Sequence, residues 1–336
     1  MRLPRSVWVG ALLALCLATS AGEKRAVRFC TVGDVLLDRG VRMAIKKDGP
    51  EALLLDVTPI LKGTDLALFN LECPVSDLGD LVTKRYSFRG DPSALPALKN
   101  AGLNIAGLAN NHTLDCGREA LLDTIARLEG AGIMTVGAGK DQESAERGRI
   151  IAVHGVKVAI LAFAAMPIEG MVEAPEKPSL ARASEETVSR AIGRAKRKAH
   201  LVVVTFHWGP EFQGVRSVNQ RALAHLAVES GADLVLGHHP HVLQGIERYR
   251  GKLIVYSLGS FLFDLHRPEA RLSAIFVCAL GKKGVTDAQI IPVIADPAHP
   301  RPASGEEATE VLERIASLSD GGGAILVRAT DHLELH

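Results

Sequence analysis

The sequence lacks the features that define several protein classes. Cysteine accounts for only 5 of 336 residues and is scattered, which excludes a dense disulfide framework. No apolar run is as long as the ~18 uninterrupted residues that indicate a membrane-spanning helix. Lysine plus arginine (39) balance aspartate plus glutamate (38), so no nucleic acid partner is indicated. The chain also has no internal repeat, no P-loop and no dinucleotide fingerprint, and its scattered aromatic residues predict no base-stacking platform.

The N-terminal segment has the pattern of a secretory signal peptide. Arg2 and Arg5 precede an apolar run over residues 7–17, and small residues follow up to Ala21. We therefore expect residues 1–21 to be a signal peptide and the protein to be exported, to the periplasm or the extracellular space. Retention of this segment as an uncleaved membrane anchor is the alternative. The cysteines beyond it are expected to be buried or site-flanking thiols: Cys30, Cys73, Cys116 and Cys278.

The rest of the sequence alternates apolar runs with amphipathic segments, which predicts an α/β domain. We expect this domain over residues 22–300, with a C-terminal helix and tail over residues 301–336 packing on it or trailing it. Strands are predicted at residues 26–32, 65–69, 103–108, 133–136, 150–153, 157–163, 201–205, 272–280, 284–294 and 325–327. Helices are predicted at residues 40–47, 51–61, 91–100, 184–198, 218–229 and 306–317, and directly after Gly117. Residues 297–302 are expected to be a proline-rich connector.

A histidine cluster follows the apolar run that ends at Gly237. His239 and His241 are two residues apart, so in an extended or turn conformation both imidazoles can face one point, as two ligands of one metal centre must. Pro240 restricts the backbone between them and favours a rigid loop at a strand end. A solvated histidine-rich loop, or one histidine satisfied by the backbone, is the alternative.

Polar side chains also stand at the ends of four other predicted strands, where open α/β sheets place their sites. Asn70 and Glu72 share one face of their strand because they are two residues apart. The alternative for this set is structural, since Asp and Asn also cap helices and make turns. The strand-end residues are Asp34, Asn70, Glu72, Asn111, His112, Asp115 and His207.

Carboxylate, amide and imidazole groups on successive strands can together form a dinuclear metal site. Oxygen ligands combined with imidazole suit Mn, Fe or Zn rather than Mg alone. A centre of this kind activates water near neutral pH and binds the attacked phosphoryl or acyl oxygen.

Together, the motifs resemble those of the CapA family of capsule-synthesis or poly-γ-glutamate biosynthesis proteins over about residues 27–294. This family is similar to the calcineurin-like metallophosphoesterases, which implies a four-layer α-β-β-α sandwich of the metallo-dependent phosphatase type with its site at the sheet edges. The motifs are Gly33-Asp34, Asn70-Leu71-Glu72, Ala109-Asn110-Asn111-His112 with Asp115 and Gly117, His207-Trp208-Gly209 with Glu211, and Gly237-His238-His239-Pro240-His241 followed by Tyr256-Ser257-Leu258-Gly259, Phe261 and Asp264.

The resemblance implies a role for each matching residue and a cofactor of one or two divalent ions, with Mn, Zn or Fe expected. The implied metal ligands are Asp34, Glu72, Asn111, His207, His239 and His241. The implied catalytic residues are His112, the general acid beside the leaving group, and Asp115. The expected substrate contacts are Asn70, Glu211, Arg89 and Ser260.

The sequence departs from the family pattern at three positions. Leu36 stands where phosphoesterases carry the histidine of an Asp-x-His motif, so a single metal is as compatible with the sequence as two. Ser260 replaces a usual asparagine and Cys116 a common aromatic residue, which implies altered packing or substrate contacts.

These observations predict an exported metal-dependent hydrolase. Its expected partner is an anionic polymer or a cell-wall or capsule precursor, such as poly-γ-glutamate, a capsular polysaccharide or a phosphorylated intermediate. A membrane-bound capsule synthesis complex is a further candidate partner. The first alternative is a non-catalytic accessory protein that binds polymer in an export complex. A nucleotide-processing phosphoesterase is the second.

Overall fold

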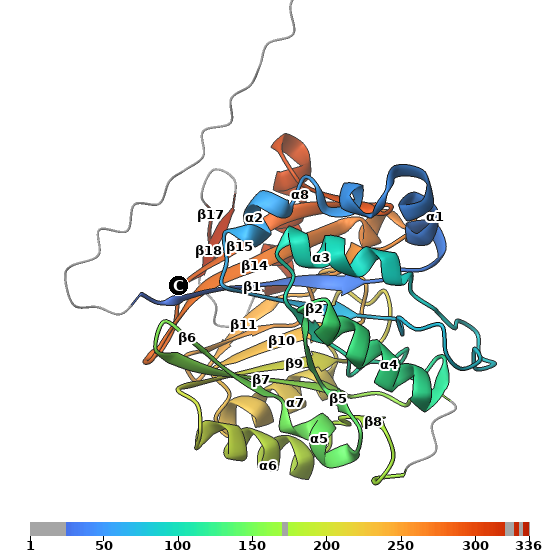
Figure 1. The fold of residues 1–336 in the computed structure, drawn as a ribbon. Helices are drawn as coiled ribbons and strands as arrows, with labels where there is room; N and C mark the ends of the chain where they lie inside the picture. Colours follow the sequence, from blue (N-terminus) through green and yellow to red (C-terminus); the bar gives the residue numbers. More distant parts are fainter. Residues whose placement is uncertain (1–24, 170–173, 320–325, 329–331, 336) are drawn as a thin grey trace, which may run out of the picture.

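The computed structural model describes residues 25–169, 174–319, 326–328 and 332–335. The predicted signal peptide lies outside the described residues. Two large β-sheets face each other, and helices cover their outer faces (Figure 1). The layers therefore follow the order α-β-β-α, and the expected four-layer sandwich is confirmed.

The first sheet is mixed and contains ten strands within the described residues. Four of its strands run parallel to one another: β1 (Val27–Val35), β2 (Leu66–Leu71), β3 (Ile105–Gly107) and β4 (Met134–Val136). The sheet continues from β1 through antiparallel strands: β14 (Leu272–Gly281), β15 (Gly284–Asp296), β18 (Leu333–Leu335) and β17 (Leu326–Arg328). Two short strands pair off this path: β13 (Ser260–Leu262) with β1, and β16 (His299–Pro302) with β15.

The second sheet has six strands, and its four central strands are parallel. Their nearly continuous apolar sequences suit strands that are buried on both faces. In order across the sheet, the strands are β11 (Ile246–Tyr249), β12 (Lys252–Val255), β10 (Leu234–His238), β9 (Leu201–His207), β7 (Val156–Ala164) and β6 (Arg149–Val153). A separate small sheet pairs β5 (Ala138–Gly139) with β8 (Ser179–Leu180).

The helices form the two outer layers (Figure 1). Over the first sheet lie α1 (Arg39–Asp48), α2 (Thr58–Lys62), α3 (Leu95–Ala101) and α8 (Gly305–Ser319). Against the second sheet pack α5 (Gln142–Arg147), α6 (Glu185–Lys196) and α7 (Val218–Glu229), while α4 (Gly117–Gly130) packs beside β4. Short 3₁₀ segments are η1 (Pro50–Leu54), η2 (Pro92–Ala94) and η3 (Pro268–Ala270).

Local sequence explains most helix boundaries. Ser184 accepts a hydrogen bond from the Thr187 amide at the start of α6, as expected for an N-cap. Asp91 accepts a hydrogen bond from the Ser93 amide and caps η2, and Gly102 ends α3 with a φ of 111°.

Two predictions about local structure were wrong. The predicted helix over residues 51–61 is instead η1 followed by α2, because Pro59 has no amide hydrogen to continue the first helix. The expected connector at residues 297–302 contains β16, since an edge strand tolerates proline where no partner strand needs its amide.

Two apolar cores hold these layers together. One lies between the sheets and continues under the helices of the first sheet, and the other lies between the second sheet and helices α6 and α7. The predicted buried thiols are confirmed, since Cys30, Cys73, Cys116 and Cys278 are all buried and free. Across the described part of the chain, no helix has both the length and the apolar character needed to cross a membrane.

Candidate metal centre

Both sheets contribute side chains to one buried point at the carboxyl ends of their parallel strands. From the first sheet come Asp34, within β1, and Glu72, directly after β2. From the second come His207, the last residue of β9, and His239 and His241, which follow β10. None of the five is more than 6% exposed. The structure thus brings together residues that the sequence placed at separate strand ends.

The Glu72 carboxylate stands at the middle of this group. Its Oε1 atom lies 3.4 Å from Nε2 of His241 and 3.8 Å from Nε2 of His207. The Nε2 atom of His112 is 4.0 Å away. Although it is fully buried, Oε1 accepts no hydrogen bond from any described residue. Because buried polar atoms are almost always paired, this orphaned oxygen indicates a place for a cation.

Asp34 is held by groups from both sheets. Its Oδ1 accepts a hydrogen bond of 2.8 Å from the Asn70 amide, and its Oδ2 accepts one of 3.2 Å from the backbone amide of His239. Burial by itself raises the pKa of Asp34, but the His238 and His241 side chains outweigh burial and hold this pKa well below its usual range. Asp34 is therefore an ionised carboxylate, which a metal ligand must be.

The His-Pro-His loop has a strained backbone. His239 and His241 have φ angles of 96° and 57°, in a region that side chains other than glycine rarely adopt. Such conformations cost about 1–3 kcal/mol each and persist only where the surroundings enforce them. Here the His239 amide donates to Asp34, and the Phe212 amide donates to the Pro240 carbonyl at 2.7 Å. The loop is thereby fixed with both imidazoles facing the centre.

The histidines differ in charge. Burial and then the charge of neighbouring histidines lower the pKa of His207 well below its usual range and that of His239 to about 3, so both are neutral and keep a lone pair for a metal. Burial opposes protonation of His241 as well, but Glu72 and Asp34 raise its pKa well above the usual range. Burial is the main cause of the raised pKa of Glu72, with the charge of Asp34 adding to it and that of His241 opposing it.

Three overlapping sets of side chains could each hold a metal ion, with ligand atoms within 4.8 Å of one another. The sets are Glu72-His207-His239, Asp34-Glu72-His241 and Glu211-His239-His241. Asn111 adds an amide oxygen 2.9 Å from Nε2 of His207. These oxygen and imidazole donors fit a divalent metal.

His112 and Asp115 form a pair beside the centre. Nδ1 of His112 lies 2.7 Å from Oδ2 of Asp115, which fixes the ring with Nε2 turned toward Glu72. Lys84 lies 2.6 Å from the other oxygen of Asp115 and donates to the Asn111 carbonyl at 2.8 Å. The Phe88 ring packs on His112 with ring centroids 4.3 Å apart. The pair is therefore rigid and has one nitrogen free to exchange a proton.

The four expected substrate contacts divide into two groups. Asn70 and Ser260 are buried and bind protein groups, since Asn70 donates to Asp34 and Glu72 while the Ser260 hydroxyl lies 3.3 Å from Nδ1 of His241. The Arg89 guanidinium donates to backbone carbonyls at residues 76–79. In this structure these three side chains bind protein groups, and their direct contact with a substrate stays a prediction. Glu211 is exposed, and its carboxylate lies within 4.8 Å of a ring nitrogen of both His239 and His241.

Sequence reasoning missed several functional neighbours. Lys84 was visible only as one of several basic residues in a polar loop, and no local pattern links it to Asp115. Asn110 donates from its amide to the Asn70 side chain and the Leu71 carbonyl and accepts from the His112 amide. Its place directly before Asn111 was the only available signal.

The chain matches the family described as bacterial capsule synthesis protein PGA_cap over residues 28–265. The capsule biosynthesis protein CapA of Bacillus anthracis is 30% identical over 93% of this chain and 78% of its own length. The PGA biosynthesis protein CapA of Bacillus subtilis (strain 168) is 32% identical over 81% of this chain and 72% of its own.

Among solved structures, the 5'-nucleotidase precursor from Thermus thermophilus has a TM-score of 0.49 at 14% identity, covering 87% of this chain and 58% of that chain. A likeness of that strength carries no conclusion about activity. The family match over most of the described chain and the two CapA relatives agree with the motifs around the candidate centre. The chain therefore belongs to the bacterial capsule synthesis protein family PGA_cap, the CapA family that its sequence motifs predicted.

Proposed function

We propose that this protein is an exported, metal-dependent hydrolase that acts on an anionic polymer or its precursor in capsule or poly-γ-glutamate biosynthesis. The observation that carries the proposal is the buried, unpaired Oε1 of Glu72 facing three imidazole nitrogens. The similarity to the capsule and PGA biosynthesis proteins of the two Bacillus species supports the biosynthetic role, and the N-terminal sequence supports export.

The residues that would hold the metal come from both sheets: Asp34, Glu72, Asn111, His207, His239 and His241, with Glu211 at the exposed side. A divalent ion bound by this set supplies Lewis-acid activation of water and of the scissile group. Glu211 makes up for the histidine that is missing at Leu36, because its carboxylate reaches His239 and His241.

The chain's own residues would handle the proton and the orientation of the substrate. His112 delivers a proton from Nε2 to the leaving group, while Asp115 holds Nδ1 and Lys84 balances the carboxylate charge. Two arginines lie over aromatic rings next to the site histidines, and each also pairs with a carboxylate, Asp264 for Arg39 and Glu269 for Arg267. Arg39 lies over Phe88 at 5.4 Å and Arg267 over Phe212 at 4.3 Å.

Elemental analysis and hydrolysis assays test this proposal. The purified mature protein should retain Mn, Zn or Fe, and His239→Ala should remove both the metal and the hydrolysis of phosphodiester, phosphomonoester or amide substrates. His299→Ala is the matched control, since this ring in β16 lies beside Asp48. A folded wild-type protein that binds none of these metals would contradict the proposal.

A second candidate function is that of a non-catalytic accessory that binds polymer. The buried Leu36 favours it, because this residue removes one ligand from the first motif. Polymer production in cells separates the two functions. If His112→Ala leaves polymer amount and length unchanged while deletion of the chain disrupts them, the protein is an accessory.

A further inference from the structure

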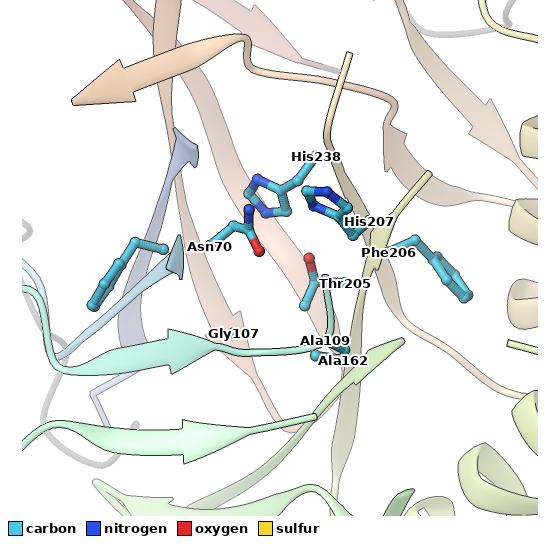
Figure 2. Close-up of a pocket in the computed structure, with 9 residues that line it drawn as sticks. Asn70, Gly107, Ala109, Ala162, Thr205, Phe206, His207 and His238 are labelled. Atoms are coloured by element: carbon cyan, nitrogen blue, oxygen red, sulfur yellow. The ribbon is translucent and has the colours of Figure 1, made fainter. Parts of the chain in front are cut away.

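A small cavity lies behind the candidate centre, between the two sheets. Its volume is about 10 Å³, and Asn70, Gly107, Thr205, His207 and His238 are among its lining residues. Figure 2 shows the side chains of Asn70, Thr205, His207 and His238 converging on one space, with the Thr205 hydroxyl and the Asn70 oxygen turned into it. A cavity of roughly 10–15 Å³ with two to four polar partners is what one buried water requires.

Several polar atoms around this cavity are buried and unpaired. The Thr205 hydroxyl, Nδ1 of His207 and Nε2 of His238 have no hydrogen-bond partner among residues that the structure describes, while Nδ1 of His238 faces Oδ1 of Asp34 at 3.6 Å. These side chains belong to residues that are only 4%, 2% and 3% exposed. Buried polar atoms in folded proteins nearly always have a hydrogen-bond partner. One group placed in this cavity could be the partner of Thr205, His207 and His238 together.

We propose that one water molecule occupies this cavity and orients His207, with Thr205 and His238 as positioning residues. The role of this water rests on the proposed metal binding, since Nε2 of His207 faces Asn111 and Glu72 at the centre. Histidine ligands of metals almost always bind a second group through their other nitrogen, which fixes the ring and its tautomer. No described protein group takes that place for His207.

Water suits this position better than a fixed donor or acceptor. In the metal-free protein, Nε2 of His207 lies 2.9 Å from the Asn111 oxygen and can donate to it, which leaves Nδ1 as an acceptor. When Nε2 binds a metal, the proton resides on Nδ1, which becomes a donor. A water held by Thr205 and His238 can donate to Nδ1 in the first state and accept from it in the second.

Substitutions of Thr205 test the inference. Thr205→Val removes the hydroxyl but keeps the shape, and Thr205→Ser keeps the hydroxyl. For Thr205→Val we expect affinity for Zn²⁺, measured by titration calorimetry, to fall about 10–100-fold. In the metal-free variant we also expect histidine ¹⁵N spectra to show a mixture of His207 tautomers in place of the single Nε2–H form. Thr205→Ser should retain both properties.

Gly107→Ala gives an independent test that leaves every polar residue in place. A Cβ at Gly107 would meet no atom closer than 3.5 Å, so the methyl group fits and takes up space at the cavity wall. Zinc affinity should fall as it does in Thr205→Val.

Three results would overturn the inference or its basis. A high-resolution crystal structure of the wild-type protein without a water at Thr205 and His238 would refute it. Wild-type zinc affinity and an unchanged His207 tautomer in Thr205→Val would refute it as well. A folded wild-type protein that binds no Zn²⁺, and none of the other metals, would instead refute the proposed function and with it the role given to the water.

Discussion

Replacing Glu72 by Gln is expected to stabilise the metal-free protein while removing its response to metal. In the metal-free state two carboxylates, Asp34 and Glu72, face one protonated imidazole, His241, and Oε1 of Glu72 accepts no hydrogen bond from the described residues. An unpaired buried polar group costs about 1–3 kcal/mol, and more when charged. The substitution leaves one carboxylate against one imidazolium, so we expect the free energy of unfolding to rise by about 1–3 kcal/mol in EDTA.

The pH dependence of this gain has a definite sign. The pKa of Glu72 is raised in the folded protein above its ordinary value of 4.5. Ionisation of Glu72 therefore lowers the free energy of unfolding, and this loss grows as the pH rises above 4.5. The advantage of Glu72→Gln should therefore be larger at pH 7 than at pH 4.5. At a metal concentration 100 times the dissociation constant, the wild-type protein should gain about 2.7 kcal/mol that the variant does not gain.

Urea unfolding of both proteins, in EDTA and with Mn²⁺, measures these differences. Glu310→Gln on the exposed face of α8 is the matched control and should change neither value. The reasoning is refuted if Glu72→Gln destabilises the metal-free protein, or if Mn²⁺ stabilises the variant as much as the wild-type protein.

Three further substitutions give separate predictions. His239→Gln should make the metal-free protein less sensitive to acid. The pKa of His239 is lowered to about 3 in the folded protein, so the wild type loses about 5 kcal/mol of stability as the pH falls from 6.5 to 3. Acid unfolding followed by fluorescence measures this difference. Glu211→Gln should lower the metal affinity or the number of bound ions measured by elemental analysis. If the metal content is unchanged, Glu211 is not a metal ligand, and the prediction that it contacts the substrate remains. Lys84→Met should lower kcat about tenfold, because the His112-Asp115 pair loses its support and the Asn111 carbonyl loses a hydrogen bond. An unaltered kcat would remove Lys84 from the mechanism.

Local sequence patterns were enough to predict most of the longer strands and most of the side chains that meet at the candidate centre. Apolar runs such as residues 201–204 are long enough to identify buried strands without any knowledge of their partners. The two-residue spacing of His239 and His241, and of Asn70 and Glu72, predicted correctly that each pair faces one point, because that geometry depends only on the neighbouring backbone.

The partners of each side chain were decided by tertiary structure. Asn70 and Ser260 have the chemistry of substrate contacts, and only the pairing of β1 with β2 and β13 shows that they hold Asp34 and His241 in place. The contact of Glu211 with the histidine loop is equally non-local, since it requires the Phe212 amide to meet the Pro240 carbonyl.

The sequence by itself thus determined the fold class, the family and the positions from which a metal site could be built. Only the packing of the two sheets against each other decided three further features. These are the ring nitrogen that faces the centre, the carboxylate oxygen that is left unpaired and the cavity behind His207. The physical reason is the distance along the chain over which each effect acts. Periodicity and capping act over a few residues, whereas hydrogen-bond partners and residual space depend on segments far apart in the chain.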